Sequence, residues 1–365
     1  NCFFKKGGLF FMKKQLMALL ATFSMAVSLF AYNPPYSGEN LYQIANPELL
    51  AGAANASGGA TFTIVPGSIA FNPALTALEQ RTVLNVSYTA LIDSKRASAD
   101  DSAYGQAFQI GTIIPTKWLV FTGVMQGTFT NFPRMDLGNS LDFHLGASKN
   151  VTDKLYVGLN AYTGLYLGDT FDYTVGADFG ALYFFDDMAF LKTPRLGLAL
   201  VNLGKPLTKY TNALGLDGTS DGVSYPGFIT PRASFSATLF KVQKVSCAFT
   251  SELYFPSCQN AVCGVGLGFA YADIVTLSVG WEANVRELVS NSTSISWPSV
   301  GLGFKFAINS SGISKANADW AQSEVIPSAA WQNLHNGIQA ISAGARLDLG
   351  MKDTTAPEII LWDEE

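Results

Sequence analysis

The sequence contains few charged residues. Aspartate, glutamate, lysine and arginine together make up 14% of its 365 residues, whereas about a quarter is usual for a soluble globular protein. The formal net charge is −5 and the basic residues form no cluster, which argues against a nucleic acid as a partner. Such a low content of charge is typical of a protein that exposes little of its surface to water.

Histidine is almost absent. The two histidines, His144 and His335, are far from the cysteines in the sequence, so we expect no zinc or other metal site. A serine triad needs a histidine base, and His144 alternates with Asp142 as a strand residue does. The glycines from Gly264 to Gly268 resemble a nucleotide-binding loop, but they alternate through a strand pattern with no helix after them. We therefore expect no enzyme, no catalytic residue and no cofactor.

Long apolar runs are confined to the start of the chain. Elsewhere no run approaches the ~18 residues that a transmembrane helix needs. Met12-Lys13-Lys14 precedes an apolar run that ends at Ala31, which is the pattern of a secretory signal peptide. We expect cleavage after Ala31, and we interpret residues 1–11 as upstream read-through. Cleavage would remove four lysines and no acid, so the formal charge would change from −5 to −9.

Cysteine is also scarce. Four occur in the chain, and Cys247, Cys258 and Cys263 remain after the expected cleavage. Cys258 and Cys263 flank a predicted hairpin loop, and in an exported protein such a pair can form a disulfide. The alternative is that all three are small apolar residues or loop thiols, and the sequence does not decide between the two.

Alternation of apolar with small residues is the dominant pattern. From Gly264 to Tyr271, every second residue is valine, leucine, phenylalanine or tyrosine, and the residues between them are glycine or alanine. A period of two predicts a β-strand and excludes a helix. A thirteenth strand is expected at 339–351 and another between Ser314 and Val325, because a barrel with both ends on one side needs an even number. The first twelve are expected at about 82–92, 104–114, 117–130, 139–149, 154–166, 173–185, 194–203, 229–240, 243–255, 261–271, 274–285 and 296–309.

The connections between these strands alternate in length. Short ones such as 115–117 and 150–153 alternate with longer ones such as 93–103 and 204–228. An up-and-down barrel inserted from the periplasm has this rhythm, whereas a Greek-key sandwich has no reason for it. We therefore predict an all-β fold over residues 82–351, a transmembrane up-and-down antiparallel β-barrel of about 14 strands, or about 12 as a fallback. The expected location is the outer membrane, with its lipid and the barrel-assembly machinery as partners.

The segment before the first strand, residues 32–81, has a different character. It is rich in alanine and glycine and shows no strong period. Asn72-Pro73 is typical of a turn, and Pro73 suits the first turn of a short helix. A compact insert in the lumen fits this composition, because small residues allow tight packing against strands whose inner faces are also small. At the other end of the chain, we interpret residues 352–365 as a tail.

Two short motifs in this segment carry a resemblance to a known family. Ala51-Gly-Ala-Ala54 and Ile69-Ala-Phe-Asn-Pro-Ala74, followed by a long run of barrel strands, are similar to the long-chain fatty-acid transporter (FadL-like) family of outer-membrane proteins. Members of that family are fourteen-stranded barrels whose N-terminal segment forms a hatch in the lumen. The resemblance implies passive uptake of hydrophobic compounds, with long-chain fatty acids as the small-molecule ligand. It also implies that the hatch residues include Phe71, Asn72, Pro73 and Ala74.

Two further predictions depend on the barrel. Alternation places several polar side chains on the inward face, where a wet or plugged lumen would receive them, because buried charges need partners or water. As an alternative function we keep a barrel that docks or shuttles exported proteins, or one that acts as a surface adhesin. The short connection 168–172 and the tail favour this alternative. The inward polar candidates are His144, Asp178, Glu282 and Arg346.

Overall fold

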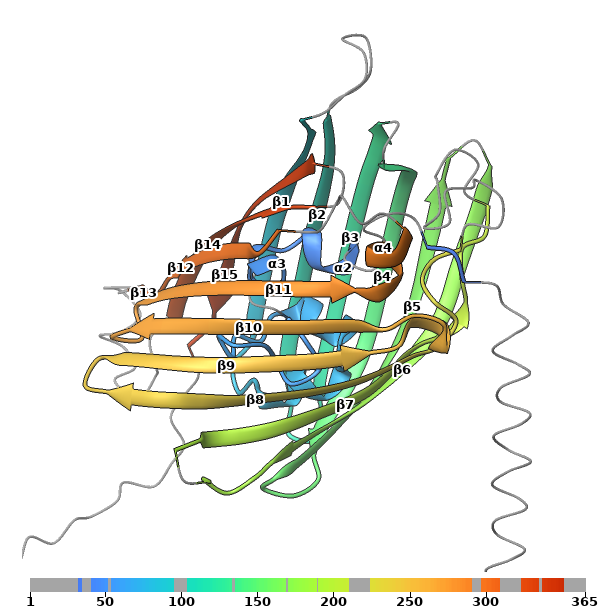
Figure 1. The fold of residues 1–365 in the computed structure, drawn as a ribbon. Coiled ribbons are helices and arrows are strands. Elements are labelled where there is room, and N and C mark those ends of the chain that lie inside the picture. Colours follow the sequence, from blue (N-terminus) through green and yellow to red (C-terminus); the bar gives the residue numbers. More distant parts are fainter. Residues whose placement is uncertain are drawn as a thin grey trace, which may run out of the picture.

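A computed structural model shows a barrel built mainly of strands (Figure 1). The predicted signal peptide, 1–31, and the predicted tail, 352–365, lie outside the described residues, as does His335. The structure describes residues 32–34, 41–51, 54–94, 104–132, 135–168, 170–188, 190–209, 224–290, 297–308, 323–334 and 337–350.

The strands follow one another around the barrel, each antiparallel to its neighbours. The ring closes where β1 pairs with β15, from Val83 opposite Asp348 to Asp93 opposite Ile338. β12 and β13 are two parts of one strand, because both pair with β14 in one register on either side of Lys305. The described residues thus form a closed barrel of 14 antiparallel strands, which confirms the predicted fold.

The strands have the following bounds: β1 (Val83–Asp93), β2 (Tyr104–Pro115), β3 (Val120–Phe132), β4 (Met135–Asn150), β5 (Leu155–Leu167), β6 (Phe171–Phe184), β7 (Lys192–Lys205), β8 (Thr230–Val242), β9 (Val245–Tyr254), β10 (Val262–Tyr271), β11 (Val275–Asn284), β12 (Ser299–Phe304), β13 (Phe306–Ile308), β14 (Ser323–Asn333) and β15 (Ile338–Asp348). Two short helices, η4 (Pro256–Cys258) and α4 (Val285–Ser290), follow β9 and β11.

The outward face of the barrel is apolar and the inward face is polar. On β1, Leu84, Val86 and Tyr88 project outward with 43%, 56% and 52% of their surface exposed. The alternate residues Asn85 and Ser87 are buried. A soluble protein shows the reverse arrangement, so this outer surface is suited to lipid. The protein is a multi-pass β-barrel of the outer membrane.

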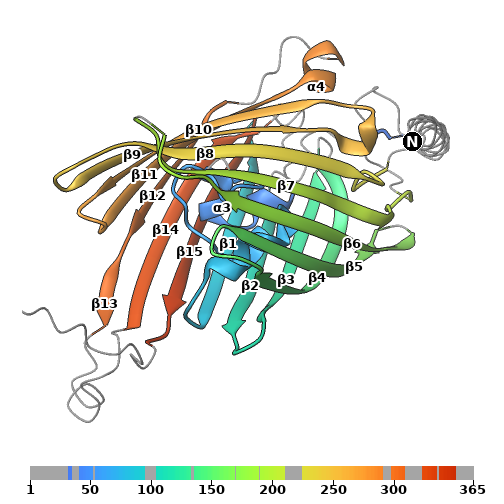
Figure 2. The same ribbon diagram turned by 90° about the horizontal axis from the view of Figure 1, so that it is seen from below.

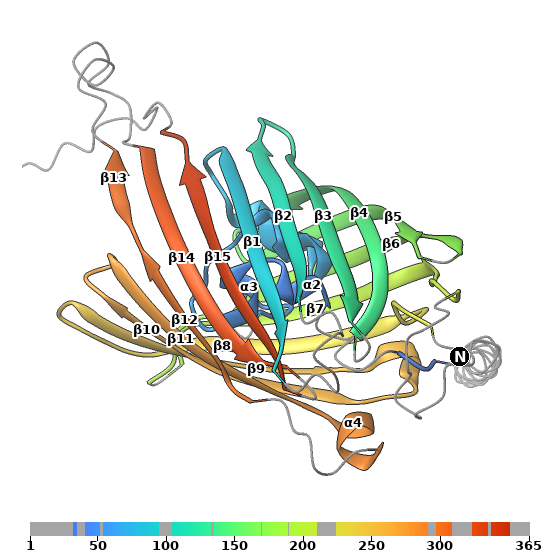
Figure 3. The same cartoon turned by 90° about the horizontal axis from the view of Figure 1, so that it is seen from above.

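A segment that contributes no strand lies inside the barrel (Figures 2 and 3). It contains α2 (Leu41–Ile44), α3 (Pro47–Ala51), η2 (Pro66–Ala70) and η3 (Pro73–Leu78). We call its described residues, 41–51 and 54–81, the inner segment. η3 packs against β4, β5 and β6, whereas α3 packs against β12 and β14. None of the described helices is long and apolar enough to cross a membrane.

Glycines on the inward face make room for the inner segment. A Cβ atom added at Gly158 would come within 3.0 Å of the Pro73 backbone, and one at Gly197 would come equally close to the Ala56 carbonyl. A larger residue would therefore force the strand or the inner segment to shift. Other strands carry glycines that meet the inner segment in the same way, namely Gly111, Gly146, Gly180, Gly268 and Gly301.

One strand lies elsewhere than predicted. We expected it between Ser314 and Val325, but the strand is β14, most of which lies beyond that interval. Its small residues Ser328–Ala330 provide no apolar stripe, and Pro327 lacks an N–H group for a ladder. Pro327 lies opposite Phe304, where the pairing of β14 with the β12–β13 strand is interrupted. A strand tolerates proline at such a break.

Of the two alternatives for the cysteines, the structure has free thiols and not a Cys258–Cys263 disulfide. Cys258 and Cys263 are both free thiols, and both are exposed. Cys263 occupies an outward position on β10 in alternation with the inward Gly264, so its thiol points away from the barrel axis. Cys258 belongs instead to η4, in the connection between β9 and β10. Cys247 is also free, and it is buried.

Candidate functional site

Asn72 joins the inner segment to the barrel wall. Its Oδ1 accepts a hydrogen bond of 2.9 Å from the Ala74 backbone N–H, which caps the start of η3. Its Nδ2 donates to the Ala56 carbonyl at 2.6 Å and to the Ala181 carbonyl of β6 at 3.0 Å. An amide side chain offers one acceptor oxygen and two N–H donors, and in Asn72 all three form hydrogen bonds.

The neighbours of Asn72 lie at the same joint. The Phe71 ring lies 5.0 Å from the guanidinium carbon of Arg232 on β8. Pro73 packs where Gly158 leaves space, and Ala74 is fully buried. The structure therefore brings all four predicted hatch residues to the contact between the inner segment and the barrel wall. To act as a hatch, the inner segment that carries these residues must move relative to the barrel wall.

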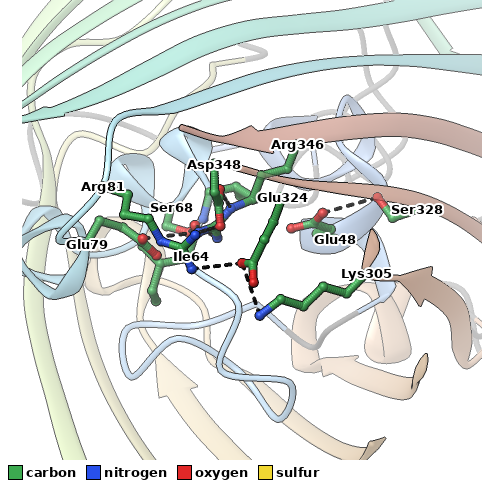
Figure 4. A network of polar contacts seen from close by, with 11 residues as sticks. Glu48, Ile64, Ser68, Glu79, Arg81, Lys305, Glu324, Ser328, Arg346 and Asp348 are labelled. Atoms are coloured by element: carbon green, nitrogen blue, oxygen red, sulfur yellow. Dashed lines mark hydrogen bonds and ion pairs between the residues drawn. The ribbon is translucent and has the colours of Figure 1, made fainter. Parts of the chain in front are cut away.

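A second contact between the inner segment and the wall is ionic (Figure 4). The Arg346 guanidinium of β15 binds both carboxylate oxygens of Asp348, at 2.5 and 2.9 Å. It also donates to the Glu79 carboxylate at 3.0 Å and to the Ile64 carbonyl, both in the inner segment. We call Arg346, Asp348, Glu79 and Ile64 the Arg346 clasp. It ties the end of the inner segment to the last strand of the barrel.

Two further polar contacts lie beside the clasp. Glu324 of β14 pairs with Arg81 at 2.8 Å and with Lys305 at 3.1 Å. Glu48 of α3 accepts a hydrogen bond of 3.2 Å from the Ser328 hydroxyl, and among the described residues its other oxygen has no partner. Desolvation by burial raises the pKa of Glu48 to about 7, although the charge of Arg346 opposes the shift.

A cavity of about 380 Å³ lies beside the Arg346 clasp and the ion pairs of Glu324. The inner segment lines it with Phe62–Ile64 and Leu78–Arg81, and the wall lines it with residues of β12, β14 and β15 and of the turn before β11. It lies at the end of the barrel where β1 begins and β15 ends, since Arg81 and Asp348 both border it. The inner segment is therefore less closely packed on this side than against the glycines of β5 and β7.

The remaining predicted polar residues face the interior in separate groups. Asn160 links two of them, because its Nδ2 lies 3.0 Å from Nδ1 of His144 and 2.6 Å from Oδ2 of Asp178. The His144 ring also stacks on Tyr162, with ring centroids 5.5 Å apart. Glu282 accepts a hydrogen bond of 3.1 Å from Gln43 of the inner segment. Glu282 thus contacts the inner segment, whereas His144, Asn160 and Asp178 form a hydrogen-bonded group within the wall strands β4 to β6.

Two buried arginines were not among the predicted site residues. Arg232 of β8 binds Glu252 of β9 through two hydrogen bonds of 3.0 and 2.7 Å. Arg195 of β7 has stacking contacts with Phe62 and Phe184. Leucines alternate with Arg195 along β7, and this pattern already indicates that its side chain points inward.

No protein-family profile matches the sequence, and no curated protein is found to be similar to it. Several solved structures are similar to it. A deltaS2 mutant of the monoaromatic hydrocarbon channel TodX has a TM-score of 0.50 and 11% identity, over 85% of this chain and 100% of that chain. The toluene transporter TodX of Pseudomonas putida has a TM-score of 0.43 and 13% identity, over 81% and 97%. A FadL homologue of Pseudomonas aeruginosa has a TM-score of 0.43 and 10% identity, over 88% of this chain and 98% of that chain. The resemblance inferred from the sequence is thus confirmed for the fold, and the chain has the architecture of a FadL-like outer-membrane β-barrel.

Proposed function

We propose that this protein is an outer-membrane channel for the passive uptake of hydrophobic compounds, with long-chain fatty acids as its substrates and the inner segment as its hatch. The observation that carries the proposal is the inner segment itself, which occupies the lumen of a closed barrel without adding a strand. In the proposed mechanism this segment moves to let the solute pass. A channel for monoaromatic hydrocarbons shares the fold, which supports a hydrophobic substrate.

We infer that the movement takes place on the side of the Arg346 clasp. Ion pairs that border a polar cavity can exchange their partners for water, so they can open without leaving a void. Backbone packed against glycine has no such substitute, because separation leaves contacts unmade. The inner segment would then pivot on η3 and Asn72, while α3 and residues 62–64 leave the wall.

Two engineered disulfides test this proposal. A Cβ added at Gly301 of β12 would lie 2.2 Å from the Cβ of Ala51 in α3, so the pair Ala51→Cys and Gly301→Cys should lock the clasp side once α3 shifts enough to bring the two Cβ atoms to the usual separation of about 3.5–4.5 Å. Thr76 and Ser148 have their hydroxyl oxygens 2.9 Å apart, so Thr76→Cys with Ser148→Cys should lock the η3 side. Both pairs are placed in a background whose native cysteines are replaced.

Uptake of a fluorescent long-chain fatty acid into liposomes is the readout. We expect the Ala51–Gly301 lock to abolish uptake until a reductant is added, and the Thr76–Ser148 lock to leave uptake unchanged. Equal uptake by both locked proteins would contradict the hatch. Absence of saturable fatty-acid binding by the unlocked protein, with an exported protein co-purifying, would favour the docking alternative. That alternative is supported by the short connection between β5 and β6 and by the tail, which lies outside the described residues.

A further inference from the structure

Three strand arginines are buried inside the barrel, and two of them have the same kind of partner. Arg232 and Arg346 each present the edge of the guanidinium that carries Nε and Nη2 to a carboxylate, and each binds both of its oxygens. This edge matches the geometry of a carboxylate, which is why arginine recognises carboxylates in pairs of hydrogen bonds. Two of the three buried strand arginines therefore have their Nε and Nη2 donors paired with a carboxylate.

Arg195 is the exception. Only 5% of its surface is exposed, and within the described part of the chain neither its Nε nor its Nη2 has a hydrogen-bond partner. These are the same two atoms through which Arg232 and Arg346 bind their carboxylates. The Phe62 ring lies 3.9 Å from the guanidinium carbon, and the Phe184 ring lies 6.0 Å from it. Stacking on a ring stabilises the charge but accepts no hydrogen bond in the plane of the guanidinium.

The surroundings of Arg195 connect it with the cavity beside the clasp. Phe62, which stacks on Arg195, is also one of the residues that line that cavity. Its backbone has φ +56°, a left-handed conformation that is strained for a bulky residue. The surroundings of Nη2 are closely packed, because a Cβ added at Gly58 would lie 3.2 Å from Nη2 and 3.1 Å from the Ile64 side chain, so room for a ligand depends on movement of the Phe62 ring. Phe62 thus forms the boundary between an unpaired buried cation and a cavity.

We propose that Arg195 binds the carboxylate head group of the substrate inside the barrel when the Phe62 ring moves aside, before the substrate passes on into this cavity. The incoming carboxylate would accept hydrogen bonds from Nε and Nη2, as Glu252 does from Arg232. This proposal rests on the proposed uptake function and assigns recognition of the fatty-acid head group to one side chain of the barrel wall. An uncharged hydrocarbon or alcohol would make no use of the site.

The test compares a naturally fluorescent polyene fatty acid with the alcohol of the same chain length. We expect Arg195→Met to weaken binding of the acid roughly 10- to 100-fold, the range for hydrogen bonds to a charged group, and to leave binding of the alcohol unchanged. Arg195→Lys should restore part of the affinity, because it keeps the charge but not the two-pronged edge. Lys192→Met on the same strand is the matched control, since Lys192 is exposed and pairs with Asp187, and it should change neither ligand.

Phe62→Gly provides a second, independent measurement. Glycine adopts a left-handed backbone without strain and opens the boundary, so association of the acid should become faster while association of the alcohol does not. Equal losses of acid and alcohol in Arg195→Met, or no loss of either, would overturn the assignment while leaving the channel intact. Failure of the unmodified protein to bind acid or alcohol would instead reject the uptake function itself. The heat-dependent gel mobility of the barrel verifies that each variant folds.

Discussion

The inner segment meets the barrel wall in two different ways on two sides. On the side of β4 to β7, short helices and backbone pack directly onto glycines, and Asn72 adds hydrogen bonds to backbone carbonyls. On the side of β12 to β15, α3 also packs on Gly301, but the end of the inner segment is held by charged side chains around a cavity. Close packing is lost all at once, whereas ion pairs beside a cavity can be replaced one by one. The comparison therefore distinguishes a fixed side from a releasable side.

The largest effect is expected on the releasable side, from Arg346→Met. The substitution leaves Asp348 and Glu79 without their cation, and removal of one partner from a buried pair typically destabilises by about 3–5 kcal/mol. Hydrogen exchange should show residues 62–65 losing protection while the amides of η3 keep theirs. Arg346→Lys is the control, because it retains a positive charge. Equal loss of protection on both sides would remove the distinction between them.

On the fixed side, Gly158→Ala should have the next largest effect. The new methyl group would collide with the Pro73 backbone, and overpacking of this kind costs about 1–3 kcal/mol. Exchange should then increase in η3 first. Gly123→Ala on β3 is the matched control, because its Cβ would meet the nearest atom, on Leu145, at an ordinary 3.6 Å. Similar destabilisation by both substitutions would mean that strand glycines matter for the wall and not for the inner segment.

A smaller effect should follow from pH through Glu48. Its pKa is about 7 in the folded protein against an ordinary 4.5, so the folded state favours the neutral carboxyl. The resulting stabilisation is complete below about pH 4.5 and is lost as the pH rises towards 7. Exchange in α3 should therefore increase with pH beyond the intrinsic rate, and Glu48→Gln should abolish that increase. Persistence of the pH dependence in Glu48→Gln would assign it to another group.

The smallest effect is expected for Arg81→Gln. This substitution breaks an ion pair whose arginine side chain is 27% exposed, and such pairs contribute about 0–1 kcal/mol. Urea unfolding should detect little change, and Lys305 remains to pair with Glu324. A loss as large as that of Arg346→Met would show that Glu324, not Arg346, holds this side of the inner segment.

Much of the barrel could be predicted because a period of two is local information. Val265, Leu267 and Phe269 project outward from β10 as their alternation indicates. β14 could not be placed, because its small residues and Pro327 remove the same signal. The sequence could not decide between a Cys258–Cys263 bridge and free thiols for a related reason: closeness in the sequence does not specify where two thiols point.

The site divides along the same line. The Asn-Pro-Ala motif directed attention to Asn72, and the structure supplies its partners on β6 and at Ala56. The Arg346 clasp joins Arg346 to Glu79, which lies 267 positions away in the sequence, and no local pattern predicts such a pair. The sequence predicts even less that Nε and Nη2 of Arg195 lack hydrogen-bond partners, because this depends on every neighbour of that side chain.

The sequence by itself determined which face of each regular strand meets lipid, that one segment differs from the strands, and where the small residues lie. These properties follow from side-chain periodicity and composition, which need no partner. Only the tertiary structure decided which strand backs each part of the inner segment, which buried charges are satisfied, and which one is not. Those properties depend on contacts between distant residues, and closure of the barrel creates all of them together.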